Sequence, residues 1–246
     1  VTEKSLTGLL VDEKFIGIDY RFRTSTDNSG KLYGLTNKGN LYTINTDTGL
    51  ASLITALKPA TGSTFTNLDG TSFAVDFNPT ADRLRVISNT GQNLRINVDT
   101  GDTIKDGDIN GISGAKVTAA AYTNSFATPI AMLATELFDL DQTGKTLTKQ
   151  NPPNAGTLNL IGNLGINLGI DNGFDIAGGD NGLALATVAG ETGPSVLYRV
   201  DLNSDTTITT PRARLAISVD GTPNLAASTI GANTTPQVID LAILLK

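Results

Sequence analysis

A stretch of strand and turn signals between Ser72 and Gly101 recurs along the chain, and this recurrence limits the possible folds more than any other feature. Within the stretch, apolar and polar residues alternate from Phe73 to Asn78, which is the period of a half-buried strand. Two further short strands are expected at 83–87 and 93–98, each bounded by Asn, Asp, Gly or Pro residues that favour turns. Three short strands joined by tight turns predict an antiparallel meander.

The opening strand of this meander has counterparts elsewhere in the chain. All but one of these strands carry an Asp in the same place, and they read FIGIDY at 15–20, FAVDF at 73–77, VTAAAY at 117–122, GFDI at 173–176 and QVIDLA at 237–242. Units of roughly 40 to 50 residues with several strands each are typical of propeller blades. The sequence therefore predicts an all-β fold, a single β-propeller of five blades with the last blade shared by N- and C-terminal strands. The expected blades cover 15–57, 72–102, 116–164, 172–215, and 237–246 closing with 1–10.

The fifth blade is short of middle strands in this sequence, and three explanations are open. The native protein has a longer start, the ring closes with a thin blade, or an open edge accepts a strand from a partner. The chain begins with Val1, so we expect that a leader has been removed from an exported protein.

Composition excludes several classes of function. The chain of 246 residues contains neither Cys nor His, which rules out disulfides, thiolate chemistry and a Ser-His-Asp triad and removes the usual zinc ligand. A net charge of −6 argues against a nucleic-acid partner, because such binders carry a basic face. No apolar run approaches the roughly 20 residues of a membrane span, so no membrane insertion is expected.

The recurring aspartates are the first candidate site. They are Asp19, Asp76, Asp175 and Asp240, with Ala121 at the equivalent place in the third unit. Inner strands of a propeller line its channel, so four carboxylates could converge there and bind calcium, a cation that prefers oxygen ligands. Converging carboxylates could instead serve acid–base catalysis. The structural alternative is that each Asp accepts backbone hydrogen bonds from the neighbouring blade.

A basic group is the second candidate site, and its members are Arg21, Arg23, Arg83, Arg85 and Arg95. Arg83 and Arg85 share one strand face, and Arg95 is on the next strand. Arginines bind carboxylates in bidentate fashion, so Arg83, Arg85 and Arg95 could form a pocket for an acidic sugar. The alternative is ion pairing with nearby carboxylates, namely Asp76, Asp82 and Asp99.

Four turns and loops invite other interpretations. The Asp-Thr-Gly triplets at 47–49 and 99–101 are similar to the motif of aspartic proteases, but their place after a third strand predicts hairpin turns. The Asp-rich segment 106–111 lacks the spacing of an EF-hand and is interpreted as an ordinary loop. The insertion QNPPNAG at 150–156 is either a functional loop or a rigid corner before the strand at 157–161.

These motifs resemble one bacterial family. IGIDYRF, KLYGLTNKGNLYTINTDTG, FAVDFNPTADRLRVISNTGQNLRINVDTG, VTAAAYTNS, QNPPNAGTLNLIGNLG and NGFDIA together resemble the family catalogued as domain of unknown function 4394, over nearly the whole chain. The resemblance implies a secreted or surface β-propeller, and so an extracellular or cell-surface location. It implies no activity and no site residues. Family members generally carry further strand-forming sequence before the segment that matches 1–10, which favours a processed start here.

The leading functional hypothesis is a non-enzymatic extracellular module that binds a protein or a carbohydrate at a propeller face. The alternative is a hydrolase or lyase that uses carboxylates in the central funnel, with or without calcium. A structural subunit completed by a partner strand, with strand-mediated self-association, is the third hypothesis. No catalytic residue can be assigned, and calcium is the one cofactor that the residues suggest.

Overall fold

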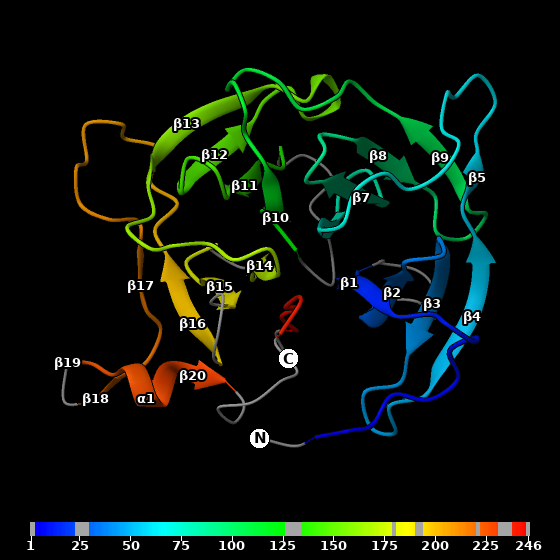
Figure 1. Cartoon of the computed structure of the whole chain (residues 1–246), viewed down its shortest axis with the longest axis horizontal. Coiled ribbons are helices and arrows are strands. Elements are labelled where there is room, and N and C mark those ends of the chain that lie inside the picture. The colour runs from blue at the N-terminus through cyan, green and yellow to red at the C-terminus, as the bar shows by residue number, and fades with distance from the viewer. Residues whose placement is uncertain are drawn as a thin grey trace.

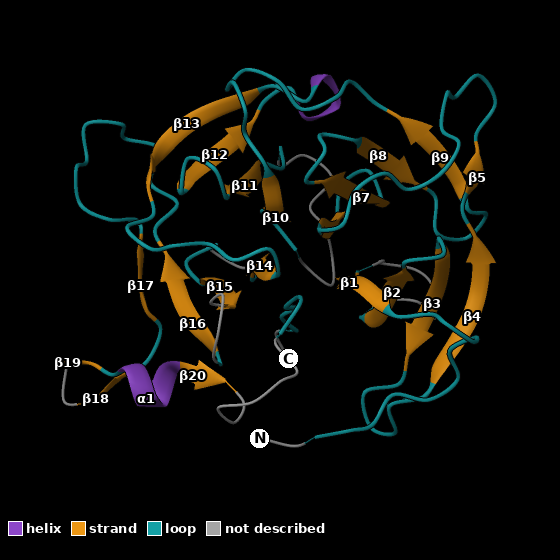
Figure 2. Cartoon of the chain, in the orientation of Figure 1, coloured by secondary structure: helices purple, strands orange, loops and turns teal. Residues whose placement is uncertain are grey.

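The computed structural model of the chain describes residues 3–22, 30–125, 134–178, 181–189, 194–219, 222–230 and 238–244. These residues form antiparallel sheets arranged around a central axis, as in a propeller (Figures 1 and 2). The prediction of an all-β propeller is confirmed. The described residues form four blades, however, and do not support the predicted fifth.

The first blade is a four-stranded antiparallel sheet. Its strands are β1 (Phe15–Arg21), β2 (Lys31–Thr36), β3 (Asn40–Ile44) and β4 (Ala51–Ala56). Burial alternates along β1 with the period of two that the sequence shows, whereas five successive residues of β2 are buried. Thus β1 is covered unevenly on its two faces, and β2 lies within the sheet.

The second blade contains the stretch that recurs in the sequence. Its strands are β6 (Phe73–Asn78), β7 (Arg83–Ser88), β8 (Asn93–Ile96), β9 (Asp102–Lys105) and the short β5 (Lys58–Pro59), which pairs with β9 in parallel. The first five residues of β6 are buried, because β6 packs between the first and third blades.

The third and fourth blades repeat the arrangement. The third blade consists of β10 (Val117–Tyr122), β11 (Leu137–Asp141), β12 (Thr146–Gln150) and β13 (Leu158–Asn163). A single 3-10 turn at Pro153–Ala155 lies between its last two strands. The fourth blade consists of β14 (Asn172–Ile176), β15 (Ala184–Ala189), β16 (Ser195–Val200), β17 (Ala213–Leu215) and β20 (Thr229–Ile230), which pairs with the start of β16.

A small hairpin and a short helix follow the fourth blade. They are β18 (Ser218–Val219), β19 (Thr222–Pro223) and α1 (Leu225–Ser228). Asn224 caps this helix by accepting a hydrogen bond from the Ala227 amide, as its residue type favours. Within the part of the chain that the structure describes, no helix is long and apolar enough to cross a membrane.

The hydrophobic core lies between blades. One cluster joins Leu35 of β2 to Val75 of β6, and a second joins Ile87 of β7 to Leu137 of β11. A third, the largest, lies between the third and fourth blades and includes Phe174. The burial of successive β6 residues on opposite faces therefore stabilises contacts with two neighbouring blades.

The segment before a blade often pairs in parallel with that blade's outer strand. Thr7 pairs with Leu50 next to β4, β5 pairs with β9, and Asn110 pairs with Thr157 next to β13. The N-terminal segment thus lies along the first blade. The sequence predicted that 1–10 would join 237–246 in a fifth blade, and the Thr7–Leu50 pairing does not support this.

The C-terminal segment 238–244 lies near the axis, between β14 and β1 (Figure 1). It occupies the place predicted for an inner strand, but it has no strand assignment. Its side chains are half-buried or exposed, whereas every residue of β10 and β14 is buried. The physical reason is the lack, among the described residues, of further strands alongside it.

Candidate functional site

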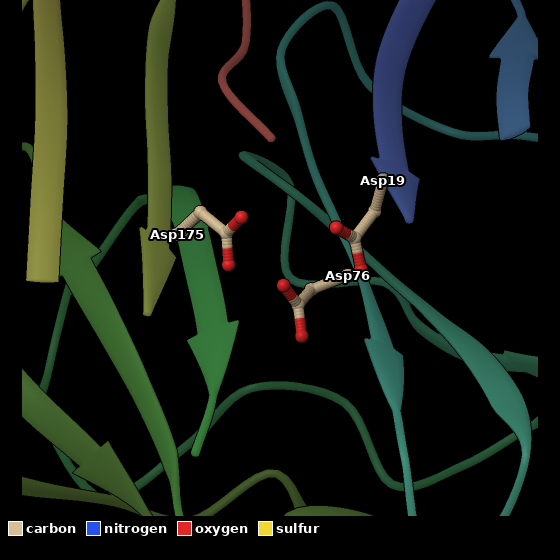
Figure 3. A group of neighbouring side chains, drawn as sticks. All are labelled: Asp19, Asp76 and Asp175. Atoms are coloured by element: carbon tan, nitrogen blue, oxygen red, sulfur yellow. The ribbon is translucent and has the colours of Figure 1, made fainter. Parts of the chain in front are cut away.

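The inner strands bring three of the four predicted aspartates together. Asp19 of β1, Asp76 of β6 and Asp175 of β14 point toward one another (Figure 3). One carboxylate oxygen from each lies within 4.8 Å of the others. The three side chains are no more than 5% exposed. Matched positions in the repeats therefore become neighbours at the axis.

Asp240 is not one of the three, although it lies close by. Its Oδ2 accepts a hydrogen bond of 2.8 Å from the amide of Ile18, next to Asp19. On β10, the equivalent position is the fully buried Ala121, as the sequence predicted. The channel is consequently acidic on the sides of the first, second and fourth blades and apolar on the side of the third.

Each carboxylate accepts a backbone hydrogen bond from another segment. Oδ2 of Asp19 accepts from the amide of Phe77 at 2.7 Å, and Oδ2 of Asp76 accepts from the amide of Tyr122 at 2.8 Å. Asp175 accepts from the amide of Ile243. These bonds link β1 to β6, β6 to β10, and β14 to the C-terminal segment, as the structural alternative for the aspartates predicted.

Burial makes these carboxylates reluctant to ionise. It raises the pKa of Asp19, Asp76 and Asp240 well above the usual range, and it raises that of Asp175 to about 6. The charge of Asp175 further raises the pKa of Asp19. Backbone amides lower each value in part by stabilising the charged form. Three carboxylates in such a space require either protons or a cation.

Calcium fits the oxygens that the three aspartates offer. Calcium binds oxygen ligands at about 2.3–2.6 Å, so two ligands on opposite sides of the ion are roughly 5 Å apart. One oxygen each from Asp19, Asp76 and Asp175 lies within 4.8 Å of the others, which this spacing allows. A divalent ion would also offset part of the charge that burial makes unfavourable.

The predicted arginines form a second site, between the second and third blades. In the sheet register Arg85 of β7 lies opposite Arg95 of β8, and Arg83 is two residues along β7. All three guanidinium side chains therefore share the face that looks toward the third blade. Like charges at directly opposed positions destabilise a sheet unless something neutralises them.

These arginines line a cavity of about 420 Å³. Its lining combines the turn between β6 and β7 with residues of the third blade, and consists of Asn78, Thr80, Ala81, Arg83, Arg85, Arg95, Tyr122, Ala134, Thr135, Pro152, Pro153 and Asn154. The insertion at 150–156 thus supplies one wall through Pro152, Pro153 and Asn154. This position is compatible with a rigid corner as well as with a functional loop.

The guanidinium of Arg85 is held in place at the back of the cavity. It donates to Tyr122 Oη at 3.1 Å, to Asn93 Oδ1 at 2.8 Å and to Asn154 Oδ1 at 2.7 Å. It also donates to Asp106 at 2.7 Å. With its side chain only 2% exposed, Arg85 has a fixed position between the two blades.

Asp106 is the carboxylate that pairs with this group. It accepts two bonds from Arg95, at 2.6 and 2.9 Å, besides the one from Arg85. Arg83 donates to the carbonyl of Asp82 at 2.7 Å, which does not neutralise it. Asp139 interacts with Arg85, but burial raises the pKa of Asp139 well above the usual range and so favours its neutral form. The three arginines and Asp106 then leave an excess of two positive charges. The cavity is therefore suited to an anion.

Arg21 belongs to a different contact, and Arg23 lies outside the described residues. Arg21 is buried between the first two blades, where it donates to both carboxylate oxygens of Asp82 and of Asp99 at 2.6–2.8 Å. Its role is structural. The ion-pairing alternative is thus correct for Arg21, whereas Arg85 and Arg95 pair with Asp106 and not with the predicted carboxylates.

Sequence reasoning missed several residues of the cavity. The sequence predicts an ordinary loop around Asp106 and strand or turn positions for Tyr122 and Asn78. It assigns none of these three residues to a binding site. The sequence does place Tyr122 at the end of an inner strand, two residues before Asn124. Loops begin at such strand ends and often carry function, so this position could have marked Tyr122 as a candidate. No local pattern marks Asp106, because its arginine partners lie 11 and 21 residues away.

Comparisons with known proteins identify a family but no function. The family model described as "Domain of unknown function (DUF4394)" matches residues 1–221. No curated protein matches the chain at a significant level.

Two solved structures from Bacteroides thetaiotaomicron VPI-5482 are similar to the chain. One, described as an auxiliary nutrient binding protein, is 12% identical with a TM-score of 0.41, and the match covers 69% of this chain and 44% of that one. The other, a structural genomics protein of unknown function, is 17% identical with a TM-score of 0.47, and the match covers 90% and 54%. The chain thus spans about half the length of either structure.

Proposed function

The chain belongs to the family of the domain of unknown function DUF4394, and from its own residues we propose that it is a non-enzymatic binding module for an acidic carbohydrate. The ligand site is the cavity between the second and third blades. The observation that supports this most is the convergence of Arg83, Arg85 and Arg95 on one cavity, where Asp106 is the only carboxylate among the described residues that is hydrogen-bonded to them.

The chemistry of the lining favours a sugar acid over a bare anion. Guanidinium groups bind a carboxylate through two parallel hydrogen bonds. Asn78, Thr80 and Asn154 add groups that can bond to hydroxyls, while Pro152 and Pro153 present apolar surface to a sugar ring. A volume of about 420 Å³ lies in the range of small-molecule sites.

Calorimetry with matched sugars tests this function. We expect galacturonate to bind and galactose, which lacks the carboxylate, to bind at least about tenfold more weakly, since a charge-assisted hydrogen bond contributes about 1.5–3 kcal/mol. Arg83→Gln and Arg95→Gln should each weaken galacturonate binding, whereas Arg214→Gln on the exposed face of β17 should not. Equal binding of both sugars, or equal effects of all three substitutions, would contradict the proposal.

We propose calcium as a ligand of the channel, with Asp19, Asp76 and Asp175 each supplying one oxygen. The support is their mutual distance of 4.8 Å or less together with their burial. The same burial disfavours the hydrolase or lyase alternative, because side chains that are no more than 5% exposed offer a substrate little surface to contact. Titration of chelator-treated protein with CaCl₂ tests the site.

Two further parts of the functional hypothesis remain proposals. An exported, extracellular location follows from the family resemblance, and detection of the protein on intact cells or in culture medium tests it. Self-association through the half-exposed segment 238–244, as the start of an incomplete fifth blade, is tested by sedimentation of the chain with and without that segment. An unchanged monomer in both cases would exclude the second idea.

A further inference from the structure

A second cavity, of about 480 Å³, opens at the end of the channel where the inner strands begin. Its walls include Phe15 at the start of β1, Phe73 at the start of β6, and Ile239 of the C-terminal segment. The N-terminal segment adds Leu6. None of these residues lines the arginine cavity, so the two sites are separate.

The walls of this mouth cavity are apolar and partly exposed. Phe15 and Phe73 are 7% and 8% exposed and form the deeper wall, while Leu6 and Ile239 keep 52% and 40% of their surface exposed at the rim. A ligand that covered this rim would remove apolar surface from water, which favours binding by about 25 cal/mol for each Å² covered. The geometry therefore selects a ligand with an apolar body.

The charged groups of the mouth cavity are predominantly acidic. Among the described residues, Glu13 and Asp171 line it together with one cation, Lys14. Hydrogen bonds from Tyr42, Asn40 and Thr36 outweigh the effect of burial and lower the pKa of Glu13, so it remains ionised. Those bonds leave Asp171 as the carboxylate available to a ligand.

The aspartates of the channel lie deeper than this mouth, and their raised pKa values limit the negative charge that they add to it. Asp19 lies four residues beyond Phe15 on β1, Asp76 lies three beyond Phe73 on β6, and Asp175 lies four beyond Asp171. At about 3.3 Å per residue the carboxylates are roughly 10–13 Å further along the strands. At the mouth itself Glu13 and Asp171 outnumber Lys14. A positive head group is therefore favoured over a negative one.

We propose that this mouth cavity binds a small organic ammonium ion with an apolar body, its head group at Asp171 and its chain against Leu6, Phe15, Phe73 and Ile239. The site does not depend on the acidic-sugar site. The charge of the mouth cavity and its apolar walls together determine the class of ligand. The effect of the charge and the effect of the apolar walls can be tested separately.

Three ligands with one body and different head groups test the proposal by calorimetry on the whole chain. They are octylammonium, 1-octanol and octanoate, each used below its aggregation limit at pH 7.5. We expect octylammonium to bind with a one-to-one stoichiometry and octanoate at least about tenfold more weakly, with octanol between them. Absence of saturable octylammonium binding, or octanoate binding of equal strength, would overturn the proposal.

Two pairs of variants place the ligand. Leu6→Asn should weaken all three ligands several-fold, whereas Leu53→Asn, at a residue of the same 52% exposure on β4, should not. Asp171→Asn should weaken octylammonium about fivefold and leave octanol unchanged, with Asp47→Asn in an exposed turn as its control. Unchanged octylammonium binding in Leu6→Asn would also overturn the proposal, since that exposed residue can change without loss of the core.

Discussion

The main-chain amide of Phe77 in the second blade donates a hydrogen bond of 2.7 Å to Oδ2 of Asp19 in the first blade. The bond is buried and joins residues 58 positions apart. The Asp in the recurring strand is therefore a link between neighbouring blades as well as a wall of the channel. Any function assigned to these carboxylates must be compatible with this structural role.

Asp175 should make stability fall as pH rises. Its pKa is raised from 3.8 to about 6, so the folded state holds a proton more tightly than the unfolded state. The contribution of this proton to the free energy of unfolding is complete below pH 4 and is lost as pH rises through 6. It amounts to about 3 kcal/mol, since each unit of pKa shift corresponds to about 1.36 kcal/mol. Asp175→Asn keeps an acceptor for Ile243 and removes the titration.

Urea unfolding from pH 4 to 7.5 in a chelator checks this. The stability of Asp175→Asn relative to the native chain should increase over that range. Parallel stability curves for the two proteins would contradict a raised pKa at Asp175.

Calcium should stabilise the chain at neutral pH and much less in acid. At a free concentration one hundred times the dissociation constant, binding contributes about 2.7 kcal/mol. At pH 4.5 protons compete for Asp19, Asp76 and Asp175, whose pKa values are all raised.

Thermal unfolding with and without CaCl₂ at both pH values checks the competition. Asp76→Asn should abolish the calcium effect, while Asp108→Asn, at an exposed carboxylate of the second blade's last loop, should leave it intact. A calcium effect that survives in Asp76→Asn would exclude the channel as its site.

Arg21 should be required for the contact between the first two blades. Its guanidinium is 1% exposed and bonds to Asp82 and Asp99, so Arg21→Met should cost on the order of 3 kcal/mol. Arg21→Lys should restore little, because an ammonium cannot bond to two carboxylates with the same planar geometry.

The matched control for Arg21 is Lys58→Met. Lys58 is 60% exposed and lies 3.7 Å from Asp102, so its loss should cost less than about 0.5 kcal/mol. Chemical unfolding of the three variants measures these differences. Similar losses for Arg21→Met and Lys58→Met would show that the buried pair adds nothing.

Gly173 should be needed for the C-terminal segment to reach its place. A Cβ at this residue would lie 2.5 Å from the amide nitrogen of Leu241 and 2.6 Å from the carbonyl carbon of Asp240. Gly173→Ala should therefore cost about 1–3 kcal/mol. In a chain that ends at residue 237 the cost should be smaller, since one of the clashing segments is gone. A double-mutant cycle by urea unfolding measures the difference, and additive effects would contradict it.

Much of the fold could be predicted from local patterns. The alternation at 73–78 and the turn residues after it correspond to β6 and the turn before β7, and repetition of that unit predicted a propeller. Matched positions also predicted that Asp19, Asp76 and Asp175 would meet, because symmetry places equivalent residues around one axis.

The remainder depends on contacts that leave no local signal. The two-residue strand β5 and the Thr7–Leu50 bridge are too short to show a period. The pairing of Arg85 with Asp106 depends on the antiparallel pairing of β9 with β8, because Asp106 directly follows β9. The spacing of these residues in the sequence does not predict that pairing. The count of five blades failed because an inner-strand motif at 237–242 does not by itself supply the strands that would pair with it.

The hydrogen bond between Ile18 and Asp240 has a consequence for the order of folding. It joins residues 222 positions apart, whereas the strands of one blade pair within a few tens of residues. Closing so long a loop has a large entropic cost, so contacts inside single blades should form first. We expect the ring to close last, and a nascent chain should hold ordered blades before its two ends are joined.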